Sequence, residues 1–243
     1  MEELKIKAIV LSSTDYKEKD KIVNLFSLEL GQISCILKNC RTNNYKLSFA
    51  YSPFSFGEFE LIKRGEMLFI KTATLIENFY NICENYNKFI IGNSILEILL
   101  KCNKPFENNE VLFINTLKIL NNLAFTDLNE NILFLKFLLG TLKVNGFKLN
   151  FKYCNSCKIP YINKIYLNLE TGDFECGACK SNYSVMIETN IFNLLSKINN
   201  KPIEDLTEII EADKVILESI KLLVLNIENR FNIKINSKNF ISI

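Results

Sequence analysis

The chain contains no histidine among its 243 residues. This absence excludes Ser-His and Cys-His nucleophile pairs, histidine-ligated catalytic zinc and histidine general bases. Neither a GxxxxGK[ST] phosphate loop nor a GxGxxG turn occurs. Glu58 and Glu60 alternate along an expected strand, as surface charges do, and form no metal-nuclease cluster. We therefore expect that the protein is not an enzyme.

A large excess of charge is also absent. The 29 Lys and Arg residues face 27 Asp and Glu residues, which gives a formal net charge of +2. This balance excludes a polybasic tail and an acidic solvating protein, so any contact with nucleic acid must come from local clustering.

Long apolar runs are missing as well. The most apolar stretch, 131–144, is interrupted by Lys136 and is shorter than the roughly 20 residues that span a bilayer. The first residues read MEELKIK, which lacks the basic start of a signal peptide. We expect a cytoplasmic protein without a membrane segment.

The first eighty residues have the alternation of β-strands. A glycine-bearing turn at 29–31 joins the second strand to the third, and a basic turn at 63–66 joins the fourth to the fifth. The sequence predicts five strands, over 4–11, 21–28, 32–38, 54–62 and 68–76. So many short strands without an intervening helix favour a small barrel of the OB type, with an SH3-like barrel as the rival.

From residue 79 onward the apolar spacing becomes that of helices. The pattern predicts helices over 79–102, 111–125, 129–144, 189–198 and 206–231. Thr189 is expected to cap the fourth, and Asp205 or Thr207 the fifth. The predicted fold class is α+β: an OB-type barrel domain at 1–78, then a mainly helical domain at 79–243 that carries a cysteine-bearing insert at about 151–183.

Four of the eight cysteines have the spacing of a structural zinc site. Two Cys-x-x-Cys turns separated by eighteen residues offer four thiolates in a tetrahedral shell. Between them, 164–169 and 171–174 suggest a strand, a glycine turn and a return. The alternatives are a redox or disulfide pair and a catalytic zinc, which a closed thiolate shell disfavours. The predicted ligands of one structural zinc ion are Cys154, Cys157, Cys176 and Cys179, while Cys35, Cys40, Cys83 and Cys102 are expected to be buried thiols.

Basic and aromatic residues interleave in the barrel segment. Its cations exceed the acids Glu58, Glu60 and Glu66 by three. Aromatic faces beside cations suit single-stranded nucleic acid, although an aromatic core with a solvated charged face explains the same residues. The predicted DNA-binding residues are Lys38, Arg41, Lys46, Lys63, Arg64 and Lys71. A second local excess surrounds the insert, either as an extension of this footprint or as solubilising charge: Lys143, Lys148, Lys152, Lys158, Lys164 and Lys180.

The order of these features resembles the RecO family of bacterial recombination mediators along nearly the full length. The resemblance lies first in the strand Ala8-Ile9-Val10-Leu11 and the charged segment 16–23 that follows it. It lies also in the turn Glu29-Leu30-Gly31, in the basic segment 38–41 at the end of the next strand, and in the segment 47–54 ahead of the second hairpin. It continues through Gly146-Phe147, the two cysteine pairs and 237–240.

This resemblance implies an N-terminal OB fold and a helical domain with a zinc insert. It also implies binding of single- and double-stranded DNA, annealing of complementary strands without ATP, and help in loading RecA onto strands coated by single-strand-binding protein. The implied partners are RecR and the acidic, Phe-ended tail of that coating protein, and the implied location is the nucleoid. The alternative is a zinc-stabilised protein-interaction scaffold that contacts DNA only through a partner.

Overall fold

The computed structural model describes residues 2–42, 47–162 and 164–241. The chain forms two compact units, residues 1–125 and 126–243. Within these described residues, no helix has the length and apolarity needed to cross a membrane.

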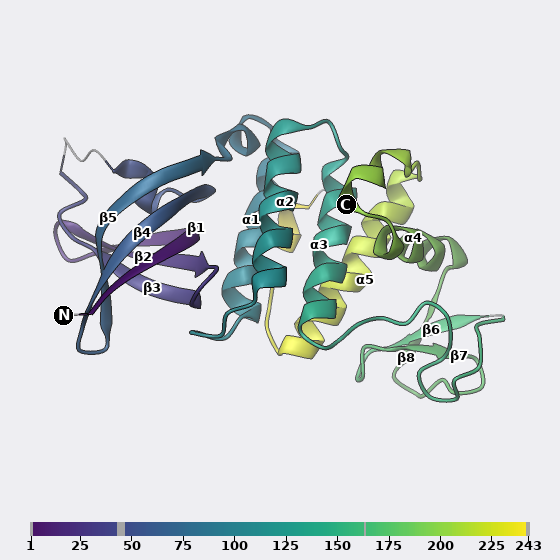
Figure 1. The fold of residues 1–243 in the computed structure, drawn as a ribbon. Coiled ribbons are helices and arrows are strands. Elements are labelled where there is room, and N and C mark those ends of the chain that lie inside the picture. The colour runs from purple at the N-terminus through teal and green to yellow at the C-terminus, as the bar shows by residue number, and fades with distance from the viewer. Residues whose placement is uncertain (1, 43–46, 163, 242–243) are drawn as a thin grey trace. The chain divides into compact units, whose positions relative to one another are not determined.

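The first unit is built on a closed barrel with the strand order β1-β2-β3-β5-β4 (Figure 1). Its strands are β1 (Glu2–Tyr16), β2 (Asp20–Ser27), β3 (Gly31–Leu37), β4 (Ser55–Arg64) and β5 (Met67–Asn78). All pairs are antiparallel except β3 with β5. The five expected strands and the OB-type barrel are therefore confirmed.

The long strand β1 allows the barrel to close. Its first half pairs with β4 and its second half with β2, and a register shift between Val10 and Ser12 bends it. Alternate residues of the strands point inward, so that Val10, Phe59 and Leu61 are fully buried in the barrel core. Side chains at the intervening positions face outward, which is the alternation that the sequence shows.

Two helices, α1 (Tyr86–Cys102) and α2 (Glu110–Phe125), belong to the same compact unit as the barrel. The Phe113 ring packs on the rings of Phe26 and Phe56, with centroids 5.7 and 6.1 Å away. The single helix expected over 79–102 is wrong at its start, because Tyr80–Glu84 forms a short 3₁₀ helix and the Asn85 side chain caps α1. A second 3₁₀ helix, Ser48–Tyr51, follows β3. The domain division after residue 78 stays a prediction.

The second unit packs three helices: α3 (Glu130–Val144), α4 (Thr189–Asn200) and α5 (Asp213–Phe231). Helix α3 contacts both others, as expected of a nearly all-apolar helix. The expected cap at Thr189 is wrong, because Glu188 occupies that position without a side-chain bond. The helix expected over 206–231 is also interrupted: Ile203–Glu208 is a 3₁₀ helix, and α5 begins only at Asp213.

The insert forms a three-stranded sheet of order β7-β6-β8. Its strands are β6 (Ile165–Asn168), β7 (Phe174–Cys176) and β8 (Ser184–Ile187), and both pairs are antiparallel. The expected strand, glycine turn and return correspond to β6 and β7. Strand β8 was not predicted, because its four residues lie beyond the second cysteine pair and depend on pairing with β6.

Candidate metal centre and nucleic-acid interface

The four predicted metal ligands converge on one point. The sulfur atoms of Cys154, Cys157, Cys176 and Cys179 all lie within 4.8 Å of one another. The Cys157 and Cys176 sulfurs are 3.8 Å apart, and a tetrahedral shell with Zn–S bonds of about 2.3 Å requires S···S distances of about 3.8 Å. The cluster could therefore hold a metal ion, and the separation is too long for a disulfide.

Local backbone geometry builds the two cysteine turns. In the first, the Lys158 amide donates to the Cys154 carbonyl and the Cys154 amide donates to the Ile159 carbonyl, each at 2.9 Å. In the second, the Cys179 amide donates to the Cys176 carbonyl at 3.1 Å. The β6–β7 register pairs Ile165 with Cys176 and so brings the second turn to the end of the hairpin.

The electrostatics of the cluster suit a thiolate at Cys154. Burial raises the pKa of this thiol, but backbone hydrogen bonds from Cys157, Cys176 and Ser156 outweigh it and lower the pKa to about 6. Hydrogen bonds with the Cys157 and Cys176 side chains raise the pKa of Cys179 to about 12. Because metal binding requires deprotonated sulfur, a centre that already favours one thiolate fits a cation.

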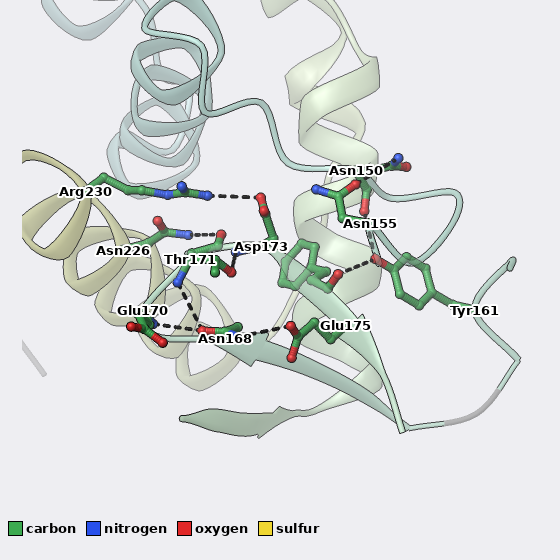
Figure 2. Close-up of polar contacts among 12 residues, drawn as sticks. Asn150, Asn155, Tyr161, Asn168, Glu170, Thr171, Asp173, Glu175, Asn226 and Arg230 are labelled. Carbon is green, nitrogen blue, oxygen red and sulfur yellow. Dashed lines mark hydrogen bonds and ion pairs between the residues drawn. The ribbon is translucent and has the colours of Figure 1, made fainter. Parts of the chain in front are cut away.

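The far end of the hairpin is fastened to α5 by polar side chains (Figure 2). Arg230 donates to the Asp173 carboxylate at 3.0 Å, and Asn226 donates to the Gly172 carbonyl at 2.9 Å. The Arg230 guanidinium also lies 4.8 Å from the centre of the Phe147 ring. Cysteine spacing alone does not indicate these contacts, because Asp173 and Arg230 are 57 residues apart.

A buried hydrogen-bond network orders the sheet from inside. Asn168 donates to Glu175 at 3.0 Å, and Ser184 of β8 donates to the same carboxylate at 2.7 Å. Tyr161 donates to the Phe174 carbonyl at 3.0 Å, and burial raises the pKa of its hydroxyl. Polar groups buried in this way stabilise one arrangement of the strands because each finds a partner.

The remaining cysteines are not part of the cluster. Cys35, Cys40 and Cys102 are buried, as expected. Burial raises the pKa of Cys35 and of Cys102 to about 12, which makes both thiols inert. The expectation for Cys83 is wrong, because this thiol is exposed in the 3₁₀ helix that replaces the start of the expected helix.

Two of the predicted DNA-binding cations meet at one aromatic ring. Lys38 follows β3 and Arg64 ends β4, and their charged groups lie 5.1 and 5.5 Å from the centre of the Phe69 ring. Phe69 is half-buried on the outer face of β5, between Ile36 and Ile62 of the neighbouring strands. The barrel thus brings two exposed cations over one half-buried aromatic ring on its outer surface, an arrangement that we call the Phe69 platform.

The other predicted cations differ in how free they are. Arg41 pairs with Asp15 at 3.1 Å and Lys71 with Glu3 at 2.8 Å. Lys63 is exposed at the end of β4. Across the described parts of the chain, Lys38, Lys63 and Arg64 form no ion pair. Lys46 lies outside the described residues.

One cation near this platform was missed from the sequence. Lys21 pairs with Asp15 at 2.6 Å and lies 5.2 Å from the centre of the Tyr51 ring. Its position at the start of β2 places it beside the end of β3, because Lys21 is paired with Leu37. A predicted β2–β3 register would have placed Lys21 beside Lys38, whereas a count of charges along the sequence does not.

Comparison with known proteins gives a consistent family. Residues 1–79 match the family model described as Recombination protein O N terminal, and residues 83–239 match Recombination protein O C terminal. The chain is 27% identical over 212 residues to the DNA repair protein RecO of Caldicellulosiruptor saccharolyticus, covering 86% of this chain and 85% of the relative. It is 26% identical over 231 residues to the DNA repair protein RecO of Clostridium novyi, covering 95% and 90%.

Proposed function

Since the chain belongs to the RecO family of DNA repair proteins, we propose that it is a recombination mediator that binds single- and double-stranded DNA. In this role it anneals complementary strands without ATP and, together with RecR, helps to load RecA onto strands coated by single-strand-binding protein. The proposed place of action is the cytoplasm, on the DNA of the nucleoid.

The observation that carries this proposal is the Phe69 platform. Cations neutralise phosphates without regard to sequence, while an aromatic face stacks an unpaired base. In OB folds, the β4–β5 loop and the face of β2 and β3 contact oligonucleotides, and Arg64 and Lys38 lie next to these elements. Two strands whose phosphates are neutralised on such a surface repel each other less, so base pairing itself drives annealing.

The number of free cations sets the expected salt dependence. Three unpaired cations, Lys38, Lys63 and Arg64, give a slope of log affinity against log salt of about −2 for single strands, at about −0.7 per phosphate. If Arg41 and Lys71 leave their carboxylate partners to bind DNA, the slope becomes about −3.5. An anisotropy titration with a mixed-sequence oligonucleotide over a salt series measures this slope.

The matching variants separate phosphate contacts from stacking. Lys38→Ala, Lys63→Ala and Arg64→Ala together should weaken binding to all sequences alike. The control Lys118→Ala, Lys197→Ala and Lys221→Ala removes equal charge at exposed lysines elsewhere. Phe69→Leu should weaken single-strand binding by about 1–3 kcal/mol and leave duplex binding nearly unchanged, because paired bases do not stack on it. A slope near zero, or equal loss in the control, contradicts the proposal. Binding that requires RecR supports the scaffold alternative.

We also propose that the four-cysteine cluster holds one structural zinc ion per chain. The S···S separation supports this, and four sulfur ligands leave no position for a reactive water. Elemental analysis should find about one zinc per chain. A thiol reagent should react quickly with exposed Cys83, and with the four ligand sulfurs only after a chelator is added. Reaction of all five without chelator would contradict a bound metal.

A groove along α5 fits the proposed tail of single-strand-binding protein. Its volume is about 380 Å³, and Ile220, Val224, Leu225 and Ile241 line it together with Lys221 and Lys238. Lys238 pairs with Glu228, which also lines the groove, so the exposed Lys221 is the cation that an acidic segment would meet beside the apolar surface for its final Phe. Leu225→Asp should abolish binding of a labelled peptide with that ending, whereas Ile210→Asp, at a 92% exposed residue outside the groove, should not. Equal binding by both variants would place the tail elsewhere.

A further inference from the structure

The charges of the insert are separated between its two ends. Four exposed lysines lie in it: Lys152, Lys158, Lys164 and Lys180. Of its carboxylates, Glu175 is 6% exposed within the Asn168 and Ser184 network, and Asp173 is paired with Arg230. Only Glu170 is exposed. The exposed lysine and carboxylate side chains of the insert are therefore mainly cationic. The four lysines exceed by one the summed negative charge of Glu170 and of a zinc ion with four thiolates, which carries a net charge of −2.

The strand register places these charges. The turn that carries Glu170 joins β6 to β7 at the end fastened to α5. Cys176 pairs with Ile165 at the opposite end, and Lys164 directly precedes Ile165. Lys158 and Lys180 directly follow the two cysteine turns. Three lysines thus gather at the cysteine end, roughly 10 Å along the hairpin from the acidic turn, at about 3.3 Å per residue.

A groove lies at the same end. Its volume is about 830 Å³, and its lining includes Ile159, Pro160, Ile162, Lys164 and Tyr166 beside the cysteines. Lys180 lies 5.2 Å from the centre of the Tyr166 ring, and Lys158 lies 5.9 Å from that of Tyr153. Lys152 directly precedes Tyr153. We call Lys152, Lys158, Lys164 and Lys180, the two rings and the groove the knuckle face.

Lys158 also occupies a backbone conformation that favours glycine. Its φ is 62°, in the left-handed region, where a side chain is disfavoured. The structure therefore holds a cation at a position for which an uncharged glycine would fit more easily. This conformation closes the first cysteine turn, in which the Lys158 amide donates to the Cys154 carbonyl.

We propose that the knuckle face is a second binding site for single-stranded nucleic acid, separate from the Phe69 platform. Lysines without carboxylate partners attract a polyanion, and an apolar groove lined by Ile159, Pro160, Ile162 and Tyr166 accepts unpaired bases, which a duplex does not offer. In the described residues, no ion pair engages any of the four lysines. The proposal deepens the proposed function: a chain with two sites can hold both strands of an annealing reaction.

The test uses the full-length, metal-loaded protein and a short labelled oligothymidine. The knuckle variant carries Lys152→Gln, Lys158→Asn, Lys164→Gln and Lys180→Gln; Asn tolerates the left-handed backbone. The charge control carries Lys118→Gln, Lys143→Gln, Lys197→Gln and Lys221→Gln, all at exposed residues. Elemental analysis first checks that each variant keeps its metal.

Native protein should bind two oligomers per chain and the knuckle variant one, with slower annealing. When the knuckle changes are added to the Lys38, Lys63 and Arg64 variant, the remaining binding should fall at least about tenfold and the remaining salt slope by up to about 3. The proposal would be overturned if the knuckle variant still bound two oligomers per chain and annealed strands at the native rate. It would also be overturned if the variant lost only its binding to RecR or to single-strand-binding protein. If instead the Phe69 platform does not bind DNA, the knuckle variant should lose all DNA binding, and the variant with Lys38, Lys63 and Arg64 replaced by Ala should lose none.

Discussion

Gly172→Ala tests how the insert is fastened to α5. Gly172 has a φ of +64°, and a Cβ atom there would lie 2.4 Å from Nε of Arg230 and 2.5 Å from Oδ1 of Asn226. The left-handed backbone costs an alanine about 1 kcal/mol. Moving Arg230 also breaks its half-buried bond to Asp173, and a hydrogen bond between charged groups contributes about 1.5–3 kcal/mol. We expect the free energy of opening of the insert to fall by about 3 kcal/mol.

Gly146→Ala is the matched control. Gly146 has a φ of +85°, but no atom lies within 4 Å of its Cβ position, so only the backbone cost of about 1 kcal/mol applies. Amide hydrogen exchange read on peptides of the insert and of α5 measures the opening free energies without assuming that both units unfold together. Equal effects of the two substitutions on the insert would refute the described contact between the hairpin turn and Arg230.

Three further predictions concern the second unit. Gly140 lies within α3 with open space at its Cβ position, so Gly140→Ala should stabilise the unit by about 0.5–1 kcal/mol in denaturant unfolding, and a loss of stability would show hidden crowding. Asn129 accepts hydrogen bonds from the amides of Asn131 and Ile132, so Asn129→Ala should cost about 1 kcal/mol and Asn129→Ser should recover most of it. Lys136 donates to carbonyl groups at the end of α4, and burial, followed by the charge of Lys143, lowers its pKa from 10.5. Because the unfolded chain then binds more protons between the folded and unfolded pKa values, stability should rise with pH in the window below 10.5. Lys136→Met should lose this rise, so parallel stability-against-pH curves for both proteins would contradict the assignment.

Local patterns were sufficient to predict the elements that pack regularly. The barrel strands alternate because one face is buried, and α3 ends at Asn145-Gly146, where Gly146 has a φ of +85°. The starts of α1 and α5 were predicted wrongly for a common reason. Apolar spacing continues through 79–85 and 206–212, but Tyr80–Glu84 and Ile203–Glu208 form short 3₁₀ helices that end before α1 and α5 begin. Ile210 illustrates this, since it fits the apolar pattern and yet is 92% exposed.

At the candidate sites, the sequence indicates which cysteines come together better than it indicates which cations pair with carboxylates. Two Cys-x-x-Cys turns carry their geometry in their spacing, so the four cysteine sulfurs lie together, and their role as metal ligands stays a prediction. Lys71 and Glu3, in contrast, are 68 residues apart, and only the barrel makes them partners. The parallel contact of β3 with β5, which brings Lys38 to Phe69, is equally non-local.

These pairings explain how a nearly neutral chain can present cationic surfaces. Three ion pairs on the barrel join a cation to a carboxylate: Arg41 with Asp15, Lys71 with Glu3, and Lys5 with Glu58. On the insert, Asp173 forms an ion pair with Arg230, and the buried Glu175 carboxylate accepts hydrogen bonds from Asn168 and Ser184. Charges beyond the screening length of about 10 Å at 0.1 M salt hardly affect a bound phosphate, so the unpaired cations near the strand matter more than the net charge of +2. Substituting Lys38 should therefore lower the affinity for DNA. Substituting Glu3, whose carboxylate pairs with Lys71, should raise it, because Lys71 is then free to bind a phosphate.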